Sequence, residues 1–177
     1  MRGSSKMKPL RFLGAIAVLA LLVHKSAFAQ TFVSTSANIL NTGFEDGNLI
    51  VRWTESGLQP GTPVSYTVTV GSEITSYACV QNKRGGTFLD SIPLTDADYG
   101  FTLPVSRHGT ISQTVGIDES DPDRTCLAGK IVLWKVDYSD VEIYDDTNGV
   151  HDLVGGGNFS LTFCNLTKNA QNCPPPS

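Results

Sequence analysis

Hydrophobic and polar residues alternate along the chain from Asn48 onward, which is the pattern of β-strands with one buried face. Two runs show it clearly. Their inward positions are all aliphatic or aromatic: Leu49, Val51, Trp53, Val64, Tyr66, Val68 and Val70. Between the two runs, Gly57-Leu-Gln-Pro-Gly61 has the residue types of a turn. The pattern therefore predicts two strands joined by a turn.

Three further strands continue this pattern. We expect Gly71-Ser-Glu73 to be a short connection, after which Ile74–Val80 returns as a hairpin partner. The run Lys130–Tyr144 exceeds the usual strand length, so we expect a break or bulge near Asp137–Ser139. The last strand is Asn158–Cys164, with its aromatic residues facing inward.

A second hairpin is expected in the middle of the chain. Phe101–Val105 alternates, Arg107-His-Gly109 forms a turn, and Ile111–Ile117 is the opposing strand. Pro104 has no amide hydrogen, which places its strand at a sheet edge or a bulge. An exposed edge of this kind is one route by which a protein partner could bind.

No segment after residue 29 shows the period of an α-helix. Seven or eight short strands separated by glycine and proline turns predict an all-β protein, an antiparallel β-sandwich, with a closed barrel as the alternative. We assign residues 47–164 to this domain. Residues 30–46 are expected to be a loosely packed lead-in, and residues 165–177 a proline-rich tail.

The first 29 residues have the order of a cleaved secretory signal. Basic residues precede an apolar run, Phe12–Val23, which is shorter than the roughly 20 residues needed to cross a bilayer. Ala27 and Ala29 then occupy the positions that a signal peptidase reads. We therefore predict a secreted or periplasmic protein with no membrane span after cleavage.

Removal of this segment makes the chain strongly acidic. It takes away five of the 13 lysines and arginines and none of the 17 aspartates and glutamates, which leaves a formal charge of −9. Such a surface repels phosphate backbones and anionic lipids, so we expect neither a nucleic-acid nor an anionic-membrane partner.

The four cysteines, Cys79, Cys126, Cys164 and Cys173, all follow the signal. An even number in an exported chain predicts two disulfides, and four cysteines allow three pairings. We favour Cys79–Cys126 and Cys164–Cys173, of which the second would staple the tail to the last strand. A zinc site is the rival interpretation, but the chain has no Cys-x-x-Cys pair.

Several segments resemble a group of small exported bacterial proteins with Ig-like β-sandwiches and no assigned function. They are Val51-Arg-Trp-Thr-Glu-Ser-Gly-Leu58, the strand Val64–Val70, and Ser76-Tyr-Ala-Cys79 before the turn Asn82–Gly86. More loosely, the resemblance runs on through Cys126 and the strand Lys130–Ile143. It implies an Ig-like sandwich and no catalytic residue.

Catalytic and metal-binding patterns are weak. There is no Gly-x-Ser-x-Gly motif, and His108 and His151 both lie in predicted loops, where Ser106 or Asp152 would be the nearest partners. The acidic loop is dense enough in carboxylates to attract a hard cation, but Pro122 interrupts it and it lacks EF-hand spacing. Its candidate ligands are Asp118, Glu119, Asp121 and Asp123, with 145–149 as a second acidic loop.

Trp53 and Trp134 lie on alternating strands, so we expect them in the core and not on a sugar-binding platform. We therefore predict an exported, non-enzymatic β-sandwich that acts as a binding or structural module, with an unidentified protein partner and no cofactor. The alternative is a calcium- or carbohydrate-dependent binding protein, or a secreted hydrolase, on the same fold.

Overall fold

The protein is built of strands throughout the part that the structure describes. A computed structural model describes residues 29–41, 47–80, 86–119, 126, 129–164 and 173. Within these residues there are eight strands, one 3-10 turn and no α-helix. The elements are β1 (Thr31–Ile39), β2 (Leu49–Ser56), β3 (Pro63–Val80), β4 (Gly86–Pro104), β5 (Thr110–Ile117), β6 (Lys130–Asp145), β7 (Val150–Leu153), η1 (Val154–Gly156) and β8 (Phe159–Thr162).

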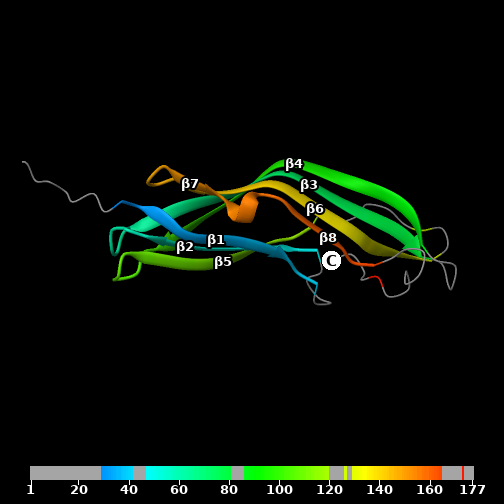
Figure 1. Ribbon diagram of the computed structural model, residues 1–177, viewed down its shortest axis with the longest axis horizontal. Coiled ribbons are helices and arrows are strands. Elements are labelled where there is room, and N and C mark those ends of the chain that lie inside the picture. Colours follow the sequence, from blue (N-terminus) through cyan, green and yellow to red (C-terminus); the bar gives the residue numbers. More distant parts are fainter. Residues whose placement is uncertain are drawn as a thin grey trace, which may run out of the picture.

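These strands form two antiparallel sheets that pack face to face (Figure 1). One sheet has the order β1-β2-β5. The other has the order β4-β3-β6-β7, and β8 pairs with β6 as well. Both short strands pair with β6 because they use different parts of it: β7 pairs with Glu142–Asp145, and β8 pairs with Lys135–Tyr138. The predicted all-β antiparallel sandwich is confirmed. The described strands form two separate sheets and not the closed barrel that was the alternative.

The main core fills the space between the two sheets. The alternating positions of β2 and β3 point into it as predicted, and Trp53 is only 2% exposed. The Trp53 ring lies 5.4 Å from the rings of Tyr66 and Phe101, a separation at which aromatic rings attract one another. Trp134 lies in a second, smaller cluster beside Ala78 and is half-buried.

The five-stranded sheet bends where one residue is added to each of three neighbouring strands (Figure 1). Gly71 of β3 lies between Asp96 of β4 and Asp140 of β6, and both aspartates have φ of 52°. Aspartate tolerates this left-handed backbone better than most residues do. Because all three strands carry the extra residue, their pairing continues on both sides of the bend.

The bend corrects one sequence expectation and agrees with another. Gly71-Ser-Glu73 is no hairpin connection, since β3 continues through it to Val80. Inward residues change there from even to odd numbers, from Val70 to Glu73. The irregularity expected near Asp137–Ser139 lies at Asp140, one residue further on.

The middle of the chain also differs from the expected hairpin. Residues 105–109 carry the chain from β4 in one sheet to β5 in the other, where β5 pairs with β2 along its whole length. The turn itself is stabilised by Ser106, whose Oγ accepts hydrogen bonds from the backbone N–H groups of His108 and Thr110. Alternation alone identifies two strands, but it does not identify their partners.

The expected lead-in contains a strand. Thr31–Ile39 forms β1 and pairs antiparallel with β2, with a bulge between Phe32 and Ser34. The apolar residues of this segment are few and do not alternate, since Phe32 and Val33 are adjacent, and its polar outward positions look like those of a loop. Residues 42–46 lie outside the described residues, as does the predicted tail except for Cys173.

Both disulfides have the favoured pairing. Cys79 is bonded to Cys126 with a Cα–Cα distance of 5.8 Å, and Cys164 to Cys173 with 5.2 Å. No cysteine is free, so the rival zinc site is ruled out. Cys164 and Cys173 belong to the smaller cluster of apolar side chains, at the end of β3 where Cys79 also lies.

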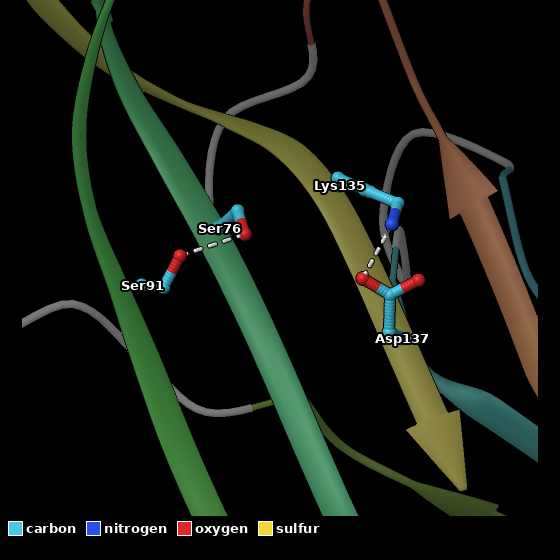
Figure 2. A network of polar contacts seen from close by, with 4 residues as sticks. All are labelled: Ser76, Ser91, Lys135 and Asp137. Atoms are coloured by element: carbon cyan, nitrogen blue, oxygen red, sulfur yellow. Dashed lines mark hydrogen bonds and ion pairs between the residues drawn. The ribbon is translucent and has the colours of Figure 1, made fainter.

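Small polar contacts link side chains on the strands beyond the bend. Figure 2 shows the hydroxyls of Ser76 and Ser91 meeting at 3.0 Å across β3 and β4. On β6, Lys135 and Asp137 form an ion pair of 2.7 Å between half-buried side chains. Such a pair contributes little stability, about 0–1 kcal/mol, because water screens it.

The predicted signal segment, residues 1–28, lies outside the described residues. Within the ranges that are described, no helix has the length and hydrophobicity required to span a membrane.

Candidate functional site

The outer face of the β1-β2-β5 sheet is lined by small polar side chains. They follow from the same alternation that sends Val51 and Trp53 inward. Their register forms two rows across the sheet. One row is Ser34, Thr54 and Ser112, and the next is Ser36, Arg52 and Thr114.

A shallow groove of about 490 Å³ crosses this face. It is lined by the two rows together with Gln113 and Trp53. The Trp53 side chain is buried on the other side of the sheet, so its backbone provides the lining. The hydroxyls of Thr54 and Ser112 contact each other at 2.7 Å. The groove therefore offers hydroxyl groups, the Arg52 guanidinium and backbone groups, with almost no apolar side chain.

Arg52 is the one charged side chain among the described residues that line the groove. It is exposed, and its Nη1 donates a hydrogen bond to Oδ1 of Asn38 on β1. A guanidinium has five N–H donors, so this bond leaves others for a ligand. An anionic or carbonyl-bearing ligand suits this arrangement better than a cationic one.

Strand β5 forms an open edge beside the groove. Among the described strands it pairs with β2 alone, so its other side presents backbone N–H and C=O groups. Its sequence, Thr-Ile-Ser-Gln-Thr-Val-Gly-Ile, contains no charged residue and no proline. Ser112, Gln113 and Thr114 are all exposed. Natural edge strands usually carry a charge or proline that blocks pairing, and β5 lacks both.

The other edges are less open. Strand β4, which contains most of the predicted edge segment Phe101–Val105, is indeed an edge strand, but it carries two prolines and several aspartates. Strand β1 lies against β7, β8 and η1. Thr35 on β1 donates a 2.6 Å hydrogen bond to the Asp152 carboxylate on β7, which joins the two sheets there.

A polar group of three residues is enclosed in the core at the end of β2. Glu55 is fully buried and its Oε2 accepts a 2.7 Å hydrogen bond from the Tyr66 hydroxyl. Burial raises the pKa of Glu55 to about 7, opposed by the Tyr66 hydrogen bond and reinforced by the carboxylate of Asp145. Burial and Glu55 also raise the pKa of Tyr66.

Asp145 in this group is itself 1% exposed and holds the turn after β6. Its Oδ1 accepts hydrogen bonds from the backbone N–H groups of Thr147 and Asn148, and its Oδ2 accepts one from the Asn148 side chain. Glu55 Oε1 makes no hydrogen bond to a described neighbour.

The histidines predicted as weak catalytic candidates have structural surroundings. His108 is exposed in the turn before β5, and its Nε2 accepts a hydrogen bond from Arg107. His151 lies on β7 and stacks on Tyr144 with ring centroids 5.3 Å apart. The Ser106 hydroxyl accepts hydrogen bonds from the backbone of its turn, and the Asp152 carboxylate accepts one from Thr35. These bonds do not join either side chain to a histidine ring.

The acidic loop is described only up to Glu119. Asp118 accepts a 2.9 Å hydrogen bond from the Asn48 side chain, and Glu119 is buried beside Gly47. Asp121 and Asp123 lie outside the described residues. Within the part that is described, no three metal-ligating side chains come together. At the second acidic loop, Asp145 stabilises a turn.

The groove is not apparent from the sequence, because its pattern predicts a loosely packed lead-in where β1 lies. The signal was present in Ser34, Ser36 and Asn38, which alternate with less polar residues, but it has meaning only once β1 is paired with β2. The buried Glu55 had a clearer signal, since it shares the inward parity of Trp53.

Comparisons with known proteins add no assignment, because no family model, curated protein or solved structure matches this chain.

Proposed function

We propose that this chain is an exported, non-enzymatic binding module with an Ig-like β-sandwich, and that it binds an extended segment of a protein partner at the edge of β5. The observation that carries the proposal is the open, uncharged edge of β5 beside the polar groove. An added strand would pair with the backbone of β5, and its alternate side chains would lie over the groove.

The surrounding features support this choice of edge. Strand β4 carries the charges and prolines that discourage pairing, and β1 is partly covered. Two disulfides suit an oxidising compartment outside the cytoplasm. The histidines and buried carboxylates have structural contacts, which favours binding over hydrolysis.

A peptide-display selection on the chain lacking residues 1–29 tests the proposal. The peptides recovered should be extended and should bind β5, which amide exchange would show as new protection of Thr110–Ile117. In an antiparallel strand, the N–H groups of neighbouring residues point to opposite sides. Proline has no backbone N–H to donate. Of the two variants Ser112→Pro and Gln113→Pro, one therefore loses an N–H that pairs with β2, and the other loses an N–H at the open edge.

We expect the variant that keeps the native melting temperature to lose peptide binding by at least tenfold. The variant that breaks β2 pairing should lower the melting temperature. Gln113→Thr, which retains the backbone N–H, is the matched control and should bind like the native protein. Full binding by the folded proline variant, or protection that maps away from β5, would overturn the proposal. Calcium- or glycan-dependent binding at another surface would favour the alternative function.

A further inference from the structure

We infer that the segment bound at β5 carries a carboxylate side chain, and that Arg52 recognises it from the groove. This inference rests on the proposed function and specifies the chemistry of the partner. It follows from where the positive and negative charges of the two outer sheet faces lie.

Carboxylates are absent from the described lining of the groove although the chain is acidic. The outer face of the other sheet is different. There Asp98 and Glu142 flank Thr69 in one row, and Asp96 and Asp140 flank Gly71 at the bend. An exposed arginine without a neutralising carboxylate on the groove is therefore complementary to an anionic group supplied by a ligand.

The register places Arg52 at a suitable distance from the open edge. Arg52 on β2 is paired with Thr114 on β5, and an added strand would lie about 4.8 Å beyond β5. An arginine and a glutamate on the same sheet face can meet across one intervening strand, because Thr114 between them is short. The partner residue opposite Thr114, on the groove side, is therefore the position where we expect the acid.

The neighbouring side chains favour a carboxylate over other anions. Asn38 holds one side of the Arg52 guanidinium, which leaves its other N–H donors for a planar, bidentate acceptor. Ser112 and Thr114 on β5 lie between β2 and the open edge and supply hydroxyl donors. Arginine pairs with carboxylates in this geometry, whereas a lysine would act only as a point charge.

The test compares peptide pairs that bind β5 and differ only by Glu or Gln at this position. Because Arg52 is exposed, we expect a modest preference for Glu, about two- to tenfold in Kd at low salt, and a smaller one at high salt. Arg52→Gln should abolish the preference, and Arg52→Lys should retain part of it. Lys135→Gln, which removes a positive charge from the other sheet, is the matched control and should preserve it.

The outcomes separate this inference from the proposed function. If the peptides bind and the edge proline blocks them, but native protein shows no preference for Glu or Arg52→Gln keeps it, only the carboxylate inference is wrong. If no extended peptide binds at β5, the proposed function fails and this inference fails with it.

Discussion

Tyr66 donates a hydrogen bond of 2.7 Å to Glu55 where both side chains are sealed from water. The bond joins β3 of one sheet to β2 of the other, so it bridges the sandwich through its core. The Asp145 carboxylate also interacts with Glu55, and it stabilises the turn after β6. The ionisable side chain of Glu55 therefore takes part in the contact between the two sheets and interacts with the residue that stabilises this turn.

Glu55 should make the stability depend on pH. Its pKa is raised from 4.5 to about 7 in the folded state, so the folded protein binds this proton more tightly than the unfolded chain does. Its contribution is therefore full below pH 4.5 and is lost as pH rises through 7, about 3 kcal/mol in all. Urea unfolding of the native protein and Glu55→Gln at pH 5 and pH 8 measures it.

In that comparison, Glu55→Gln should be close to the native protein at pH 5 and more stable at pH 8. Glutamine still accepts from Tyr66 and can donate to Asp145 without acquiring a charge. Equal pH dependence in the two proteins would show that Glu55 does not carry this proton.

Tyr66→Phe should be destabilising at every pH. It removes a donor from a buried carboxyl group, which costs about 1–3 kcal/mol. Since the Tyr66 hydrogen bond lowers the pKa of Glu55, its loss should raise that pKa further. Thermal melts, together with titration of the Glu55 carboxyl by NMR, measure both effects, and an unchanged titration would contradict the assignment.

Gly71→Ala should disturb the bend. A Cβ at Gly71 would lie 2.8 Å from Cβ of Asp140, so the backbone would have to shift. We expect a loss of about 1–3 kcal/mol in the free energy of unfolding. Gly100→Ala in β4 is the matched control, because its nearest neighbours would be 4.0 Å away. Equal effects at the two glycines would argue against close packing at the bend.

The two disulfides should contribute unequally. They close loops with sequence separations of 47 and 9, for which chain entropy gives about 4 and about 2.7 kcal/mol. Replacing Cys79 and Cys126 by serine should therefore lower the unfolding free energy more than replacing Cys164 and Cys173. Denaturant titrations of the paired variants provide the measurement, and the reverse order would mean that native packing dominates.

Expression of the full chain in a secreting host tests the export prediction. Intact mass and N-terminal sequencing should find a protein that begins at Gln30 and has no free thiol. Retention of residues 1–29, with the product left in the cytoplasm, would contradict a cleaved signal.

The sequence predicted the inward residues better than it predicted the connections between strands. Alternation located Leu49, Val51 and Trp53 in the core because side-chain direction in a strand is local. Gly71-Ser-Glu73 has the composition of a turn, and an aligned bulge uses the same residues. What distinguishes them is the partner residue on each neighbouring strand, which local sequence does not specify.

The candidate site was less predictable for the same reason. The groove combines side chains from β1, β2 and β5, two of which are distant in sequence from the third. Ser34, Arg52 and Thr114 have no motif in common. Their chemistry becomes a site only through strand pairing. The cysteine pairing could be favoured from the position of the tail, but the sequence alone left three pairings open.

The bend at Gly71, Asp96 and Asp140 also limits how this protein can change its length. Deleting a single one of the three residues would turn every side chain beyond it to the opposite face of that strand, while the two neighbours kept theirs. Only a triple deletion would restore agreement. A gain or loss at one of the three sites would therefore put that strand out of step with its neighbours unless the other two changed as well.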